Sequence, residues 1–86
     1  MDEYGIVLAR SARKELESLG EPLQSRVLAR IESLSGNPRP SGCRKLEGSQ
    51  DLWRIRVGEY RIVYSIGDRE KLVDIVVIRH RSDVYR

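Results

Sequence analysis

A two-residue turn between two alternating segments constrains this chain more than any other feature. Residues 52–57 (LWRIRV) and 60–66 (YRIVYSI) alternate apolar and polar side chains, and only a Gly-Glu pair beginning at Gly58 separates them. This pattern predicts a β-hairpin, and glycine at the first turn position favours a type II′ turn. Because so short a turn fixes the register, Val57 is expected to pair with Tyr60, and the remaining pairs follow from that one.

The fixed register sorts the side chains of this hairpin onto two faces. Arg54, Arg56 and Arg61 share one face, and Arg56 lies directly opposite Arg61. Like charges at directly opposed positions destabilise a sheet by about 0.2–1 kcal/mol, so folding alone gives no reason for this cluster. It is either a solvated outer sheet face or a cradle for the phosphates of a nucleic-acid backbone. The other face is apolar and suited to a core: Trp53, Ile55, Val57, Tyr60, Ile62 and Tyr64.

The composition favours a phosphate-bearing partner only slightly. The chain of 86 residues has 16 Lys and Arg against 13 Asp and Glu, a formal net charge of +3. Thirteen of the basic residues are arginine, whose planar guanidinium matches phosphate geometry better than a lysine ammonium does. Residues 44–86 hold the whole excess, with ten basic and seven acidic side chains. The basic charge is therefore concentrated in the same half as the hairpin.

The first half of the chain predicts one strand and two helices. Residues 4–9 are mostly apolar and indicate a short strand, after which Ser11 is suited to cap a helix that ends at Gly20. A second helix is expected from Pro22 to Gly36. Because the two helices are separated by only a residue or two, they should form an antiparallel pair that covers one sheet face. The proline-rich residues 37–42 should then form an irregular connection.

The second half adds further strands to the hairpin. Residues 72–78 are almost continuously apolar, which predicts a central strand with both faces covered, and residues 44–46 indicate a weaker strand. We therefore expect an α+β fold: an N-terminal strand and a two-helix antiparallel hairpin packed on a mainly antiparallel sheet of about four strands. A chain of this length makes a single domain, residues 1–86.

Several classes of protein are excluded by what the sequence lacks. No apolar run approaches the ~20 residues that span a bilayer, and the acidic N-terminus does not match a secretory signal. A single cysteine, Cys43, cannot form an internal disulfide and fits a reducing cytosol. Cys43 and His80 alone are too few for a zinc site. We therefore expect a cytoplasmic protein without a metal or a membrane partner.

The chain ends in a second basic segment, residues 79–86 (RHRSDVYR), directly after the apolar strand. Basic tails are often only solubilising, but this segment should emerge beside Arg61. The loop of residues 67–71 does not fix the phase of the strand, so either Arg79 or His80 could point toward the arginine face. Both therefore remain candidates for the site.

Taken in order along the chain, these residues strongly resemble the RelE/ParE toxin superfamily, and most of all its RelE branch in type II toxin–antitoxin systems. The hairpin and the terminal segment together are specific, and the similarity covers essentially the whole chain. The matching residues are the Tyr4-x-Ile6 strand, Asn37-Pro38-Arg39-Pro40, Lys45-Leu46-x-Gly48, the run from Leu52 to Tyr64, and His80-Arg81-x-Asp83-Val84-Tyr85.

The resemblance implies a ribosome-dependent endoribonuclease that cleaves mRNA in the A site through attack of a ribose 2′-OH on the adjacent phosphate. No metal or cofactor is implied, because the nucleophile belongs to the substrate; catalysis would depend on alignment and charge stabilisation. The implied partners are the ribosome, its mRNA and a cognate antitoxin protein. Charge stabilisation is assigned to Arg61 and Arg79, and substrate alignment to Arg54, Arg56 and Arg81.

Proton transfer is implied for the end of the chain. Tyr85 would stack on or orient the nucleotide and could share in proton transfer, and His80 is a candidate acid or base because its ordinary pKa lies near 6.5. Some relatives carry lysine at the two strand positions that are Arg54 and Arg56 here, and arginine cannot act as a base. Two alternatives stay open: a ParE-like toxin that poisons DNA gyrase by binding, and an inactive relative that only binds RNA or antitoxin.

Overall fold

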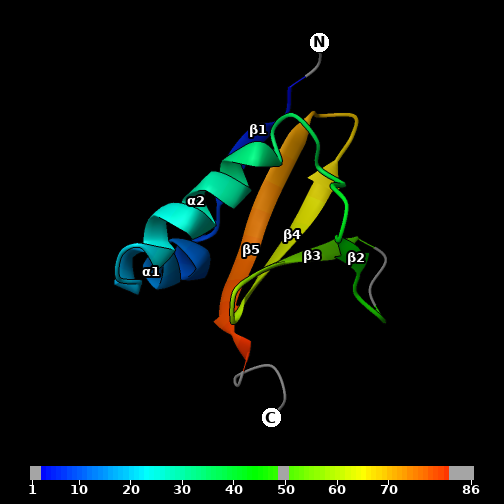
Figure 1. Cartoon of the computed structure of the whole chain (residues 1–86). Coiled ribbons are helices and arrows are strands. Elements are labelled where there is room, and N and C mark those ends of the chain that lie inside the picture. The colour runs from blue at the N-terminus through cyan, green and yellow to red at the C-terminus, as the bar shows by residue number, and fades with distance from the viewer. Residues whose placement is uncertain (1–2, 49–50, 82–86) are drawn as a thin grey trace.

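Five strands form one mixed sheet, and two helices pack on one of its faces (Figure 1). The structure is a computed structural model that describes residues 3–48 and 51–81. The strand order is β1-β5-β4-β3-β2, with β1 parallel to β5 and the other pairs antiparallel. The elements are β1 (Gly5–Leu8), α1 (Arg10–Ser18), α2 (Leu23–Ser33), β2 (Arg44–Lys45), β3 (Leu52–Val57), β4 (Tyr60–Gly67) and β5 (Leu72–His80).

The expected α+β fold is confirmed, with one more strand than the expected total of about four. The additional strand is accounted for by β1, which joins the sheet at its edge as the parallel neighbour of β5. The weak strand expected at residues 44–46 is present as β2, which pairs with β3 at the opposite edge. Neither described helix is long and apolar enough to cross a membrane.

The register predicted for the β3–β4 hairpin is confirmed pair by pair, from Val57 with Tyr60 back to Trp53 with Tyr64. Gly58 has a φ of 58°, and Lys71 is the only described non-glycine residue with a positive φ. A positive φ at the first turn residue alone is typical of a type II′ turn. The local chemistry of the turn therefore sets which side chains share a face of the sheet.

The core lies between the helix pair and the sheet. Ala12 and Val27 are fully buried on the two helices, and Ile62, Tyr64 and Ile75 are fully buried on β4 and β5. These strand residues alternate with the side chains of the opposite face, as the period of a strand requires. The helices therefore cover only one face of the sheet, and we call the other the open face. The expectation that both faces of β5 are covered was wrong for the described residues.

A β-bulge interrupts the pairing of β4 with β5. Tyr64 pairs with Ile75 and Val63 with Val77, so Val76 is an extra residue on β5. Such an insertion leaves backbone groups outside the ladder. The Val76 carbonyl accepts a hydrogen bond of 3.2 Å from the Ser11 hydroxyl.

The prediction that Ser11 caps the first helix was wrong. The α1 helix begins at Arg10 with Ala9 as its cap residue, and no side chain caps it. Ser11 is already inside the helix, where its hydroxyl is committed to β5 instead of to the helix terminus.

The proline-rich connection is fastened to the sheet at two points. Arg39 donates two hydrogen bonds, of 3.1 and 2.9 Å, to the Asp68 carboxylate in the β4–β5 loop. The buried Tyr64 hydroxyl donates to the Pro38 carbonyl at 2.8 Å. Tyr4 also donates to Asp68, at 2.7 Å, and together with Arg39 it lowers the pKa of that carboxyl to about 2. These contacts fix the end of the sheet remote from the hairpin turn.

Candidate nucleic-acid interface

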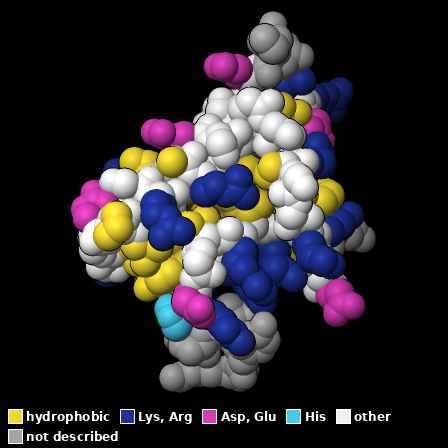
Figure 2. All heavy atoms as spheres, in the orientation of Figure 1, with side chains coloured by type: hydrophobic (Ala, Val, Ile, Leu, Met, Phe, Trp, Pro, Cys, Tyr) yellow, Lys and Arg dark blue, Asp and Glu magenta, His cyan; other side chains and the backbone are white. Residues whose placement is uncertain are grey.

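Five arginines line up on the open face of the sheet in two neighbouring rows. The first row crosses three strands, because Arg61 on β4 pairs with both Arg56 on β3 and Arg79 on β5. The second row contains Arg44 on β2 opposite Arg54 on β3. We call these five residues the arginine rows. Figure 2, which views the molecule from the helix side, shows Lys and Arg side chains gathered below β3.

Most of this charge is accessible. Arg44, Arg56 and Arg79 are exposed, whereas Arg54 and Arg61 are half-buried. Within the described part of the chain, neither Arg56 nor Arg79 forms an ion pair with a carboxylate. Two exposed guanidinium groups are therefore available on the three-strand row for an external anion.

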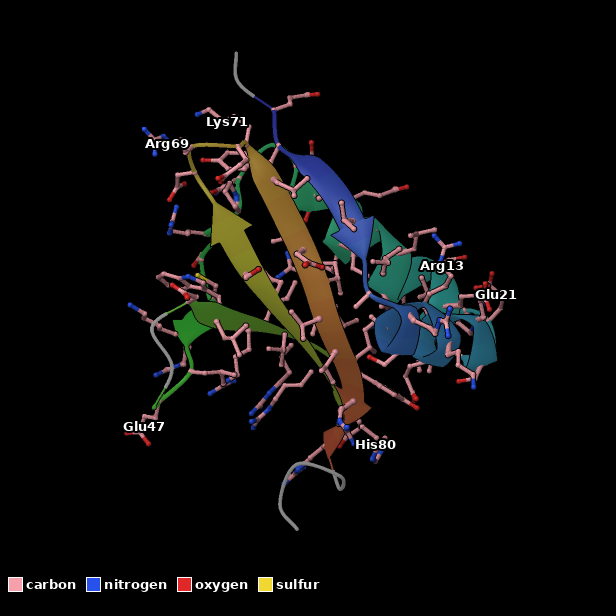
Figure 3. All side chains as sticks on the ribbon, turned by 180° about the vertical axis from the view of Figure 1, so that it is seen from behind. Arg13, Glu21, Glu47, Arg69, Lys71 and His80 are labelled. Atoms are coloured by element: carbon pink, nitrogen blue, oxygen red, sulfur yellow. The ribbon has the colours of Figure 1, made fainter. Side chains whose placement is uncertain are left out.

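The Arg79 and His80 side chains lie on opposite faces, and the β5 bulge decides which is which. Downstream of Val76, Arg79 pairs with Arg61 and His80 with Tyr60. The His80 ring packs edge-on against Tyr60, with ring centroids 5.1 Å apart and an interplanar angle of 85°. Arg79 therefore joins the arginine rows, and His80 lies on the helix side of the sheet, at its lower end in Figure 3.

A pocket of about 50 Å³ lies where the hairpin turn meets the end of β5. The Arg81 backbone N–H donates to the Glu59 carbonyl at 2.6 Å, and the Arg81 guanidinium lies 3.6 Å from the Glu59 carboxylate. Glu59 belongs to the turn, so the alternation of side chains along the strands could not predict that its carboxylate would lie beside the arginines. The pocket is lined by Arg56, Gly58, Glu59, Tyr60, Arg61 and Arg81.

An apolar groove of about 350 Å³ adjoins the arginine rows on the open face. Val63 and Val77 pair across β4 and β5 to form its floor. They lie two residues from Arg61 and Arg79 on the same strands, and therefore on the same face. Such a surface can accept a flat apolar group while the guanidinium groups hold an anion beside it. The whole lining is Leu46, Leu52, Arg61, Val63, Val76, Val77 and Arg79.

The structure brings together most of the site residues that the sequence predicts. Arg54, Arg56, Arg61 and Arg79 share the open face, and Arg81 lines the turn pocket beside them. His80 is excluded from that face, and Tyr85 lies outside the described residues. No group of three His, Cys, Asp or Glu side chains within residues 3–48 and 51–81 could hold a metal ion.

Arg44 is the member of the arginine rows that the sequence analysis missed. The weak strand at residues 44–46 has no short turn to fix its register, so its pairing with Arg54 could not be derived. A signal was nevertheless present, because Arg44 and Lys45 form a basic pair at the start of the basic half of the chain.

Comparisons with known proteins identify the family of this chain. The family described as the ParE toxin of type II toxin–antitoxin systems, parDE, matches residues 6–85. A RelE-like toxin protein of Escherichia coli is 31% identical over 87 residues, covering 95% of this chain and 90% of the relative. The toxin RelE of Mycobacterium tuberculosis is 30% identical over 84 residues, covering 96% and 87%.

Solved structures show the same fold. RelE in the RelE–RelB complex of Pyrococcus horikoshii has a TM-score of 0.82 and 31% identity, covering 92% of this chain and 96% of that one. The toxin–antitoxin complex RelBE2 of Mycobacterium tuberculosis matches with a TM-score of 0.82 and 27% identity, covering 96% and 97%. The chain therefore belongs to the RelE/ParE toxin superfamily, as a RelE-like toxin of a type II toxin–antitoxin system.

Proposed function

We propose that this toxin is a ribosome-dependent endoribonuclease that cleaves mRNA in the A site. The observation that carries the proposal is the row Arg56–Arg61–Arg79, in which three arginines occupy paired positions on three neighbouring strands. Folding does not require such a row, since like charges at paired positions oppose it. A phosphodiester that approaches the open face would relieve this repulsion and be held by charge-assisted hydrogen bonds.

The proposed reaction uses a nucleophile supplied by the RNA. The ribose 2′-oxygen loses its proton and attacks the adjacent phosphorus, and the bond from phosphorus to the 5′-oxygen breaks. The 5′-oxygen takes up a proton, which gives a 2′,3′-cyclic phosphate on one fragment and a 5′-hydroxyl on the other. Negative charge builds up on the non-bridging oxygens in the transition state, where preorganised donors have their largest effect.

The arginines divide this work according to their positions. Arg61 is central to the row and half-buried, and Arg79 is its neighbour on β5, so these two would stabilise the charge on the reacting phosphate. Arg54, Arg56 and Arg81 would align the flanking nucleotides. None of the five can serve as a base, because arginine stays protonated.

We assign the aromatic and proton-transfer part of the mechanism to Tyr85 and remove His80 from it. Tyr85 is a candidate through its resemblance to the C-terminal tyrosine of RelE-like toxins. The His80 ring packs on Tyr60 on the face opposite Arg79, so its role would be to support the end of β5. His80→Gln should therefore leave cleavage far less affected than Tyr85→Phe.

A cognate antitoxin is the proposed protein partner. RelE is bound to RelB in the complexes from Pyrococcus horikoshii and Mycobacterium tuberculosis, which share the fold of this chain. An antitoxin that covered the arginine rows would block access to RNA. The proposed substrate would place the action of the toxin in the cytoplasm.

The decisive experiment is to incubate translating ribosomes with the protein and to map the 5′ ends of the mRNA. The proposal expects new ends within the A-site codon, and their loss in Arg61→Ala and Tyr85→Phe. Arg69→Ala is the matched control, since it removes an exposed arginine from the β4–β5 loop at the other end of the sheet (Figure 3). Intact mRNA together with inhibited gyrase supercoiling would instead support a ParE-like target.

A further inference from the structure

A second group of arginines lies on helix α2, outside the site described above. Arg26 and Arg30 line a pocket of about 410 Å³ together with Arg56 from β3. The rest of its lining is small or apolar: Ala29, Val57 and Gly58. Three arginines from two separate elements therefore line one open pocket whose lining contains no acidic residue.

The core packing of α2 determines where these two arginines lie. Val27 and Ile31 are buried against the sheet, and Arg26 and Arg30 each precede one of them in the chain. Residues four apart lie on the same side of a helix, so the two arginines form a pair along the flank of the buried stripe. Because α2 packs against β3, this flank faces the hairpin turn.

The acidic side chain just before α2, Glu21, is occupied elsewhere. The Glu21 carboxylate accepts hydrogen bonds from the Ser25 backbone N–H at 3.0 Å and from its hydroxyl at 2.9 Å. In the described part of the molecule, neither Arg26 nor Arg30 forms an ion pair. The charge of the pair is therefore not neutralised within the described fold.

Arg56 connects this pocket to the proposed cleavage site. It lines the α2 pocket and also the turn pocket that contains Arg61 and Arg81, and Gly58 is common to both linings. An anionic chain that leaves the turn pocket past Arg56 would reach the α2 pair without crossing an acidic side chain of either lining other than Glu59.

We propose that the α2 pocket binds backbone phosphates of an RNA segment outside the scissile dinucleotide. This extends the proposed function, on which it rests for the identity of the polymer. Arginine favours phosphate because its planar fork makes two parallel hydrogen bonds, and the apolar floor of Ala29 and Val57 gives no competing acceptor side chain. The pocket thus holds the RNA in place and leaves the chemical step to the arginine rows.

The test measures binding of a short single-stranded 2′-O-methyl RNA and of an RNA hairpin by fluorescence anisotropy, in a series of salt concentrations. The methyl group removes the nucleophile, so the result does not depend on cleavage. The double variant R26A/R30A should bind the RNA more weakly than the unmodified protein does. Because each phosphate contact to a single strand contributes ~0.7 to the slope of log K against log salt, the loss of two contacts should reduce the magnitude of this slope by about 1.4.

The matched control is R13A/R69A, which removes the same charge from two exposed positions that do not line the pocket (Figure 3). The conservative variant R26K/R30K should restore most of the salt slope. An equal loss in R26A/R30A and R13A/R69A would mean a general charge effect and overturn the proposal, as would unchanged RNA binding in R26A/R30A.

The two proposals fail in different ways. If the protein does not cut mRNA on ribosomes but R26A/R30A loses more RNA affinity than R13A/R69A does, the cleavage proposal fails and the proposal of an RNA-binding α2 pocket is supported. If cutting is observed and R26A/R30A loses affinity only for an acidic peptide, the pocket is a protein-binding site and the present inference is wrong.

Discussion

Arg61 is the residue on which the proposed chemistry most depends. It occupies the centre of a three-strand row, with Arg56 and Arg79 as its two cross-strand neighbours. It is half-buried, whereas both neighbours are exposed. A partly desolvated guanidinium interacts more strongly with developing charge than one fully surrounded by water.

Replacement of Arg61 by alanine should reduce single-turnover cleavage on ribosomes by about 10²–10³-fold, the usual effect of removing one preorganised donor. Arg61→Lys should recover only part of the rate, because lysine cannot make the bidentate contact. Quantified 5′ ends from a time course give the rates. A variant that retained the full rate would show that the row is not the catalytic centre.

Asp68 illustrates a residue that serves the fold and not the site. Hydrogen bonds from Arg39 and Tyr4 lower its carboxyl pKa from 3.8 to about 2. The folded state therefore binds its proton less readily than the unfolded state. The resulting stabilisation is complete above about pH 4 and is lost as the pH falls through the folded pKa.

Asp68→Asn should accordingly lower the Tm at about pH 5, and the gap from the unmodified protein should shrink toward pH 2. Thermal denaturation followed by circular dichroism at several pH values measures this gap. Glu70→Gln, which removes an exposed carboxylate from the same loop, is the control and should show no comparable gap. A gap independent of pH would contradict this account of Asp68.

Among the elements, the two-residue β3–β4 turn is short but sets the register of the hairpin, and so decides which side chains share a face. Gly58 adopts a φ of 58°, and no atom lies within 4 Å of where a Cβ would stand. A side chain there would meet backbone strain but no steric clash with neighbours. The requirement for glycine is thus purely conformational.

Gly58→Ala should therefore lower the free energy of unfolding by about 1–2 kcal/mol. Gly20→Ala is the matched control, because that position also has open space but lacks a positive φ, and it should be neutral or slightly stabilising. Urea denaturation of both variants measures the difference. Equal stabilities would show that the turn relaxes to another type.

The elements also show how much of the fold could be predicted from the sequence. The hairpin register was predictable because a two-residue turn leaves one pairing, and it placed Arg54, Arg56 and Arg61 together. The face on which Arg79 lies was not predictable, because it depends on the bulge at Val76. The residues on either side of Val76 are apolar like Val76 itself, so the sequence does not mark the bulge. The start of α1 was missed because Ser11 bonds to β5, a tertiary contact that overrides a local capping preference.

At the scale of the whole molecule, the helix pair and the sheet depend on one core. Ile31 on α2 is buried in the same cluster as Ile55 and Ile75 from the sheet. A small domain of this kind has few other sources of stability. Neither layer should therefore persist once the other is lost.

Unfolding should then be a single transition, which tests the prediction that residues 1–86 form one domain. Helical circular dichroism and the fluorescence of the single tryptophan, Trp53 on β3, should give coincident curves. Ile31→Ala should shift both curves together, with a loss of about 2–5 kcal/mol. Separate midpoints for the two signals would refute a single cooperative unit.

The whole molecule also shows why the candidate site was only partly predictable. The net charge of the chain is only +3, but the fold concentrates positive charge locally, because it brings Arg44 and the two α2 arginines next to the hairpin. Their convergence comes from strand pairing and helix packing between distant segments, for which the sequence offers no local signal. Only arginines joined by the short turn could be placed in advance.

The bulge at Val76 makes the chemistry of the β5 terminus depend on strand length more than on residue identity. Arg79 lies on the open face because the bulge leaves residue 76 out of the ladder, whichever apolar side chain that residue carries. If Val76 were instead paired regularly with Val63, Arg79 and His80 would exchange faces, whereas deleting Val76 would leave a regular ladder with Arg79 still opposite Arg61. A relative that lacks the bulge would therefore need a strand one residue shorter to keep the corresponding arginine on the open face.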